Sequence, residues 1–244
     1  VDIPLRFVSP SFDSPLPATL MELNHLRRLK LGGSTVPWVF FQLKQIFHIL
    51  ESVGSARIEG NRTTISEYIE QKLEKKERST ERYSEIANVE GAMAFIEENM
   101  SQGTPVYHHF IRQLHNLVVD GLTDEGDQTP GAYRTWDVQI TGSEHMPPVH
   151  LGVQHHMDEL LEFINAADAE KYDLLKIAIA HHRFTWVHPF GNGNGRVVRL
   201  LTYALLIKYG FNVKEGKILN PTAVFCSDRD IYYEMLSKAD GGSD

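Results

Sequence analysis

Hydrophobic side chains recur every three or four residues along most of the chain, which is the spacing of an amphipathic helix. Pro17 and Pro37 suit the first turn of a helix, and Gly54 suits a helix end. The periodicity predicts helices over residues 17–32, 36–54, 64–79, 81–100, 104–122, 152–165, 170–187, 196–210 and 227–239. We therefore expect an all-α fold.

One segment has a strand pattern instead. In residues 134–141, RTWDVQIT, the apolar residues Trp136, Val138 and Ile140 alternate with polar ones and so fall on one face of a strand. The following GSEHMPPV supplies a turn and a break. Because a single hairpin in a helical protein is typical of a surface flap, we expect a small β-hairpin flap at about residues 134–145.

The turn VHPFGNGNGR, residues 187–196, lies between two segments that are apolar on nearly all sides. Such segments are typical of buried central helices. Pro189 disfavours a helical backbone at His188 and so ends the first of these helices there. We expect the turn to be held rigidly between two core helices.

The composition limits the class of protein. A chain of 244 residues with 42% hydrophobic residues can bury a sizeable core. Its formal charge of −8 and pI near 5.8 argue against a nonspecific grip on nucleic acid, which needs Lys and Arg to neutralise phosphates. The lone Cys226 forms no internal disulfide, and the sequence shows neither an export signal nor a membrane-spanning apolar run. We therefore expect a cytoplasmic protein.

The glycine-rich turn has the composition of a phosphate site. Gly193, Asn194 and Gly195 lead straight into a helix, where backbone N–H groups and the positive end of the macrodipole attract anions. Arg196 and Arg199 are three residues apart, so we expect both to project from nearly the same face. Two guanidinium groups beside such a turn indicate polyphosphate.

His188 is the group in this turn that can take a proton near neutral pH. Two nucleotide-binding motifs do not fit. A P-loop needs Lys and then Ser or Thr after its last glycine, where this chain has Arg196 and Val197; the dinucleotide fingerprint needs a preceding strand and another glycine spacing. The residues therefore indicate a base beside a polyphosphate cradle of another kind.

HPFGNGNGRVVR resembles the active-site motif of the Fic-domain family, whose usual form is His-Pro-Phe, any residue, Asp or Glu, Gly-Asn-Gly-Arg, two residues and Arg. GAYRTWDVQITG and IYYEML are similar to the flap region and the closing helix of that family. The resemblance covers roughly residues 85 to 238. It implies a Fic domain over residues 85–244, with the motif at 188–199, preceded by an N-terminal helical segment over 1–84.

The resemblance implies transfer of AMP from ATP to a Ser, Thr or Tyr hydroxyl of a target protein, including the protein itself. His188 is then the base, and Arg199 holds the γ-phosphate. The residues implied to cradle the other phosphates are Gly193, Asn194, Gly195 and Arg196. The residues implied to dock the target as an added strand are Thr135, Asp137, Val138, Gln139, Ile140 and Thr141. Tyr232 and Tyr233 fit either an adenine pocket or the core.

Asn192 departs from the family pattern, which has a carboxylate for Mg²⁺ at this position. An amide oxygen can ligate a hard cation but adds no negative charge, so we expect Mg²⁺ or Mn²⁺ to bind weakly and chiefly through ATP. SARIEGN, residues 55–61, resembles the inhibitory motif of the family. That resemblance implies that Ser55 and Glu59 belong to an inhibitory segment in which Glu59 pairs with Arg199 in place of the γ-phosphate.

Other interpretations stay open. The same cradle suits transfer of UMP, phosphate or phosphocholine, or removal of AMP, and Asn192 also suits a catalytically weak module that binds nucleotide and protein. The oligomeric state is left open. Paired and single histidines invite a metal site, but neighbours on a helix point to different faces, so we expect them to be structural or solvated. They are His108, His109, His145, His150, His155, His156, His181 and His182.

Overall fold

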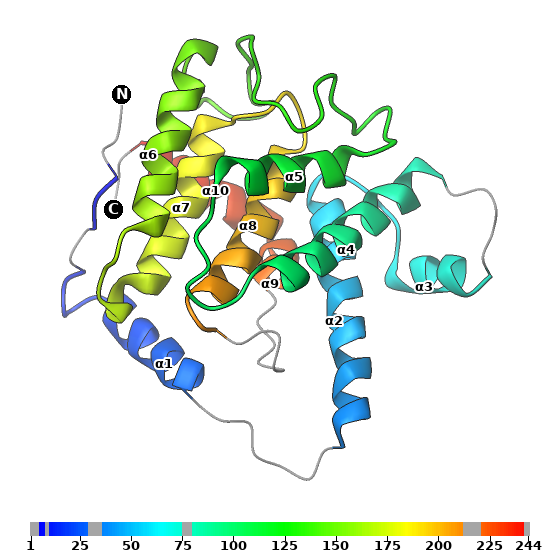
Figure 1. Ribbon diagram of the computed structural model, residues 1–244, viewed down its shortest axis with the longest axis horizontal. Coiled ribbons are helices and arrows are strands. Elements are labelled where there is room, and N and C mark those ends of the chain that lie inside the picture. Colours follow the sequence, from blue (N-terminus) through cyan, green and yellow to red (C-terminus); the bar gives the residue numbers. More distant parts are fainter. Residues whose placement is uncertain (1–4, 8–9, 29–35, 75–79, 212–220, 242–244) are drawn as a thin grey trace.

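The computed structural model describes residues 5–7, 10–28, 36–74, 80–211 and 221–241, and they form an all-helical fold (Figure 1). No strand occurs among these residues, so the all-α prediction is confirmed. None of the described helices is both long and apolar enough to cross a membrane. The longer helices are α1 (Leu16–Arg28), α2 (Pro37–Ile58), α3 (Ile65–Glu74), α4 (Glu81–Asn99), α5 (His108–Val119), α6 (Val153–Asn165), α7 (Asp173–Val187), α8 (Asn194–Lys208), α9 (Pro221–Ser227) and α10 (Arg229–Asp240). Two short 3₁₀ turns, η1 (His150–Gly152) and η2 (Glu170–Tyr172), precede α6 and α7.

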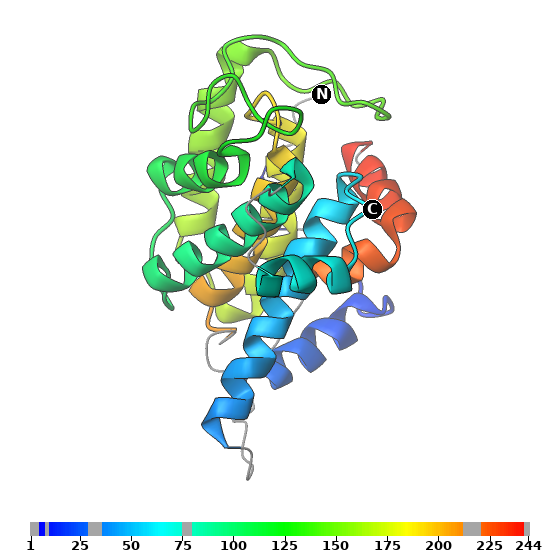
Figure 2. The same cartoon turned by 90° about the vertical axis from the view of Figure 1, so that its right-hand side faces the viewer.

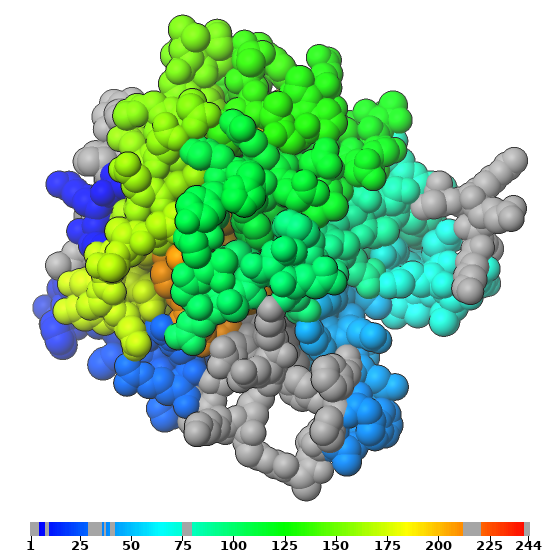
Figure 3. Space-filling view, viewed as in Figure 1, coloured from blue at the N-terminus to red at the C-terminus, as the bar shows by residue number. Residues whose placement is uncertain are grey.

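Helix α8 is the centre of the molecule. Every residue from Arg196 to Lys208 is buried, as its nearly all-round apolar sequence predicts. Helices α2, α4, α5, α7 and α9 pack against it. In the space-filling view of Figure 3, the green and yellow-green residues of the neighbouring helices leave only a narrow strip of the orange segment visible. The start of α8 is thereby anchored on several sides.

Helix α2 brings the N-terminal segment to this core and lies beside α9 and α4 (Figures 1 and 2). The predicted helix end at Gly54 is wrong, because α2 continues to Ile58. Gly54 instead allows a close approach to α9, since a Cβ atom there would lie 3.6 Å from the Cys226 and Thr222 side chains. Glu59 is the C-cap of the helix, and Gly60 follows with a φ of +107°, which suits glycine.

Other predicted boundaries shift by about a turn. Helix α5 begins at His108 rather than Thr104, because the Asn165 side chain binds both the N–H and the C=O of Val106, and the N-cap residue Tyr107 is extended. Helix α3 begins with a capping box, in which the Thr64 and Glu67 side chains bind each other's backbone N–H. The short α9 has too few residues for a periodic signal. The predicted extensions of α1 over 29–32 and of α3 over 75–79 lie outside the described residues.

The expected β-hairpin flap does not form. Residues 134–149 have no strand, and a turn closed by Ser143 N–H to Ile140 O is what remains of the hairpin. The alternation itself is real: Trp136, Val138 and Ile140 are partly buried, and the polar residues between them are exposed. The segment is held at both ends by the Arg134 side chain, which donates to Trp136 O and Pro148 O. Hydrogen bonds from the Arg134 side chain therefore hold this segment in place of the backbone hydrogen bonds between the two strands of a hairpin.

Candidate active site

The motif turn joins α7 to α8 through two residues with left-handed backbones. His188 has φ 50° and ψ 61°, and among the described residues no other non-glycine has a positive φ. Gly193 precedes α8 with φ 73°. The buried Asn194 amide accepts from Phe190 N–H at 3.0 Å and donates to Phe190 O at 2.9 Å, which closes the turn into a ring. These two hydrogen bonds within the turn therefore hold its backbone in one conformation.

His188 is the expected base, and its surroundings keep it neutral. Burial lowers the pKa of its imidazole to about 4, while the Thr185 carbonyl raises it and the nearby Arg134 charge lowers it further. The ring is therefore uncharged at neutral pH and has a lone pair available to accept a proton.

Arg134 fixes the backbone of this turn. Its guanidinium is fully buried and donates to His188 O at 2.8 Å, Val187 O at 3.2 Å, Trp136 O at 2.9 Å and Pro148 O at 2.6 Å. Its own N–H donates to Pro189 O at 2.9 Å. One side chain thus joins both ends of the flap segment to the backbone of His188, which has a left-handed conformation. Sequence reasoning assigned Arg134 no role, because its partners are backbone atoms distant in the chain.

His115 packs against the turn and supports it. Sequence reasoning assigned this residue no role either. Its ring stacks on Phe190 with centroids 3.8 Å apart and planes 6° apart. Gly131 N–H donates to its Nδ1 at 2.9 Å, so Nε2 carries the hydrogen and donates to Asn192 O at 3.2 Å. Burial lowers the pKa of His115 to about 4, which keeps this neutral tautomer. The ring is a support for the turn.

Glu59 and Arg199 meet at the N-terminus of α8. Arg199 Nη2 donates to Glu59 Oε1 at 2.5 Å and to Ser55 O at 3.1 Å, and Nε donates to Ser55 Oγ at 2.9 Å. The Arg199 side chain is 2% exposed and that of Glu59 is 26% exposed. Burial alone raises the pKa of Glu59, but Arg199 outweighs it and holds that pKa below its usual range. The structure therefore brings together three of the residues that the sequence singled out.

Gly195 shows how closely Glu59 approaches the helix. A Cβ atom at Gly195 would overlap Glu59 Oε1. The first turn of α8, where unpaired N–H groups favour an anion, therefore has a carboxylate of the same chain beside it. An incoming phosphate group has to compete with that carboxylate for both the turn and Arg199.

Arg196 does not share this position, contrary to the expectation that both guanidinium groups lie on one face. Its fully buried side chain turns towards Glu125 O, at 2.7 Å, and Val118 O, at 3.4 Å. Glu85 Oε1 lies 3.6 Å from it, and the other oxygen of Glu85 accepts from the Asn61 amide at 2.7 Å. Arg196 is thus engaged beneath the turn, and its role in phosphate binding stays a prediction.

The two tyrosines divide between the two interpretations. Tyr232 is buried, and its hydroxyl lies 2.8 Å from Nε2 of the buried His181, which also bonds Thr202. Tyr233 is 42% exposed, and Arg229 lies 5.4 Å from its ring centroid. Tyr232 is therefore buried against the core, whereas the ring of Tyr233 is partly exposed, and a contact of either with a nucleotide stays a prediction.

The residues around Asn192 do not fit a tight Mg²⁺ site. Its side-chain oxygen accepts from Gly193 N–H at 2.6 Å, and its amide donates to Gly126 O at 3.1 Å. The buried Asp127 carboxylate accepts from Asn192 N–H and from Thr129. Mg²⁺ prefers carboxylate and phosphate oxygens in octahedral geometry. Asn192 has no carboxylate, and both carboxylate oxygens of Asp127 already accept hydrogen bonds.

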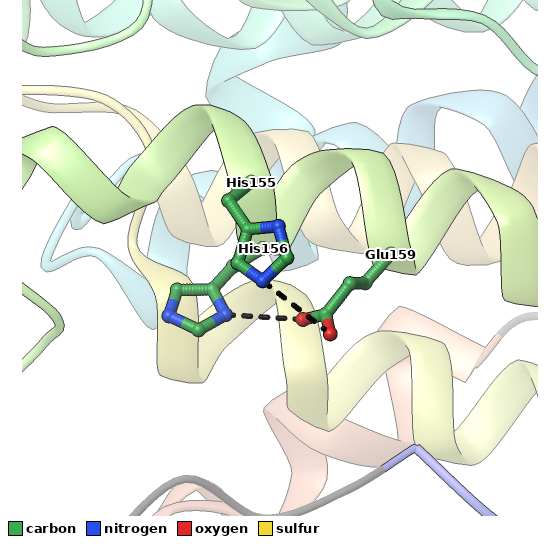
Figure 4. A group of neighbouring side chains, drawn as sticks. All are labelled: His155, His156 and Glu159. Carbon is green, nitrogen blue, oxygen red and sulfur yellow. Dashed lines mark hydrogen bonds and ion pairs between the residues drawn. The ribbon is translucent and has the colours of Figure 1, made fainter.

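Within the described ranges, one group of side chains has the composition of a metal site, namely His155, His156 and Glu159 on α6 (Figure 4). Glu159 lies 3.7 Å from His155 Nε2 and 3.2 Å from His156 Nδ1. Arg183, however, donates to Glu159 Oε2 at 3.1 Å and lies 3.4 Å from His156 Nδ1. The positive charge of Arg183 would repel a metal cation at this position. The group is therefore better described as the surroundings of the ion pair between Arg183 and Glu159.

The motif turn between α7 and α8 lies within residues 105–206, which match the family model of the Fic/DOC family. The chain is similar to "Protein adenylyltransferase Fic" of Nematostella vectensis, with 28% identity over 193 residues that cover 77% of this chain and 42% of the relative. The protein of the same name from Drosophila grimshawi is 28% identical over 200 residues, with coverages of 80% and 38%. The chain thus spans about two fifths of the length of these relatives.

The fold also matches solved structures. A Fic family protein from Desulfovibrio desulfuricans G20 superposes with a TM-score of 0.77 at 23% identity, covering all of this chain and 70% of that one. Fic-1 from C. elegans, residues 134–508, superposes with a TM-score of 0.63 at 18% identity, covering 93% of this chain and 74% of that one. The all-helical Fic fold is confirmed by these likenesses.

Proposed function

We propose that this protein is a protein adenylyltransferase that transfers AMP from ATP to a Ser, Thr or Tyr hydroxyl of a target protein, and that Glu59 inhibits it. The proposal is supported by the matching family, by the name of its relatives and by one observation: the Glu59 carboxylate lies at the N-terminus of α8 and pairs with Arg199. Because a carboxylate resembles the edge of a phosphate to a guanidinium, the site suits a polyphosphate once Glu59 has moved.

The neutral His188 accepts the proton of the target hydroxyl as the oxygen attacks the α-phosphorus. A bond forms between that oxygen and phosphorus, the bond from phosphorus to the bridging oxygen breaks, and pyrophosphate leaves. The N–H groups at the first turn of α8 and the freed Arg199 hold the phosphate charge. Arg134 holds the backbone of His188 in place through its four carbonyl contacts. Metal-bound ATP can enter this scheme, but no step is assigned to a metal because the side chains near Asn192 do not fit one.

The expected flap residues could dock the target. Thr135, Asp137 and Gln139 are exposed, and residues 134–142 run without a strand partner. A target segment adding main-chain hydrogen bonds there would complete the pairing that the chain lacks. The cytoplasmic location and a protein target with a hydroxyl side chain stay predictions.

The test compares wild-type protein, Glu59→Gly and Glu59→Gly/His188→Ala with α-labelled and γ-labelled ATP and a cell lysate. We expect α-label on protein with Glu59→Gly, less with wild type and none with the double variant, and no γ-label. Equal labelling by wild type and Glu59→Gly would reject the inhibition, and γ-label would identify phosphate transfer. A nucleotide- and protein-binding module is the second candidate, motivated by Asn192; it is favoured if Glu59→Gly binds ATP but labels nothing with either Mg²⁺ or Mn²⁺.

A further inference from the structure

An open cavity of about 330 Å³ lies next to the turn that carries Glu59. Two of its arginines belong to the end of α2 and the loop after it, and the third belongs to the start of α10. All three are exposed at the surface. The residues that line the cavity are Arg57, Gly60, Asn61, Arg62, Thr64 and Arg229.

The cavity concentrates positive charge on three arginines, and the Glu59 carboxylate acts on one of them, Arg229, without forming an ion pair with it. No acidic residue lines it, and none of its three guanidinium groups forms an ion pair within the described part of the chain. Asp228 caps α10 at Ile231 N–H, and the carboxylate of Glu67 is bonded to Thr64 at the edge of the cavity. In a protein with a formal charge of −8, three exposed arginines around one cavity favour an anionic ligand.

We propose that this cavity binds a phosphate monoester and that its occupancy opposes the inhibitory position of Glu59, the second part resting on the proposed function. A phosphate monoester carries close to two negative charges and three acceptor oxygens, which suits converging guanidinium groups better than a single carboxylate does. The volume is within the range of small-ligand sites, about 300–1,000 Å³. The ester could belong to a free small molecule or to a phosphorylated side chain of a protein.

The cavity and the inhibitory pair share the same short segment. Gly60 follows Glu59 directly and Arg57 precedes it by two residues, so an occupant touches both sides of the turn. The charge of Arg229 helps to stabilise the Glu59 carboxylate. A dianion in the cavity offsets that charge and repels Glu59, and so weakens the pair of Glu59 with Arg199. By linkage, occupancy then increases the affinity of the α8 site for ATP.

Binding is tested by titration calorimetry at physiological ionic strength. The probes are O-phosphoserine, a short phosphoserine peptide and the same peptide without phosphate. We expect Arg57→Gln/Arg62→Gln to weaken binding of the phosphorylated probes by about tenfold or more. Arg6→Gln/Arg28→Gln, which changes exposed arginines outside the cavity, should leave it unchanged. Tighter binding of the peptide identifies a phosphorylated protein as the source, and tighter binding of the free ester identifies a small molecule.

Three results would overturn the site: no binding of either phosphorylated probe, equal weakening in both double variants, or loss of binding with Arg199→Gln but not with Arg57→Gln/Arg62→Gln. Circular dichroism of every variant excludes loss of folding as the cause.

The regulatory part is tested by ATP affinity in His188→Ala protein, which binds without turnover. O-phosphoserine should tighten ATP binding several-fold there and have no effect when Glu59→Gly is added. An unchanged ATP affinity in the presence of Glu59 overturns the regulation. The two proposals fail separately: labelling by Glu59→Gly without phosphoserine binding rejects the cavity, and phosphoserine binding without labelling rejects the transferase.

Discussion

Replacing Glu59 by Ala should destabilise the protein and activate it at the same time. Removing one partner of a buried ion pair leaves the other unpaired, at a cost of about 3–5 kcal/mol. The cost here is smaller, because Arg199 keeps two hydrogen bonds to Ser55 and the Glu59 side chain is 26% exposed. We expect the free energy of unfolding to fall by about 2–3 kcal/mol. For a chain of this length the midpoint of thermal unfolding then falls by roughly 4–12 °C.

The assay combines thermal and urea unfolding with labelling from α-labelled ATP. ATP should stabilise Glu59→Ala more than wild type, since its phosphates replace the missing negative charge beside Arg199. Glu98→Ala is the matched control, because Glu98 is exposed and lies away from the pair. A variant as stable as wild type would refute the structural role of the pair. A variant that loses stability but labels no faster would refute the inhibitory role and leave the structural one standing.

Three further predictions follow from the same site. Arg134→Lys should lower the free energy of unfolding by about 3 kcal/mol and reduce labelling, because an ammonium cannot serve four carbonyls; urea unfolding checks it, and full stability would contradict the clamp. Asn192→Asp in Glu59→Gly protein should increase the affinity for Mg²⁺ in the labelling reaction by about tenfold, since it adds a carboxylate; an unchanged Mg²⁺ titration would contradict this. His115 and His188 have lowered pKa values of about 4, so protonation favours the unfolded state and stability should fall as pH drops from about 6.5 to 4. Unfolding curves across that range check it, and His115→Gln should flatten the fall.

Much of the fold could be predicted from local patterns. Period-3.6 hydrophobicity located most helices, because each helix buries one face whatever its neighbour is. Gly54 shows the limit: it looked like a helix end, but packing against α9 decided its role. The flap shows another limit, since its alternation predicted the burial of Trp136, Val138 and Ile140 correctly but did not reveal whether a second strand pairs with it.

By itself, the sequence determined the helical class and the turn with its histidine and arginine, because each depends on residue types at short spacing. The pairing of Glu59 with Arg199, 140 residues apart, was implied only by the resemblance to the Fic-domain family. Only the tertiary structure decided that Arg196 bonds Glu125 and Val118 while Arg199 bonds Ser55 and Glu59. It also decided that Arg134 and His115 hold the turn and that three arginines line a cavity beside Glu59. Those contacts join residues far apart in the chain, often through backbone carbonyls that every residue has. Their partners are therefore set by how the helices pack.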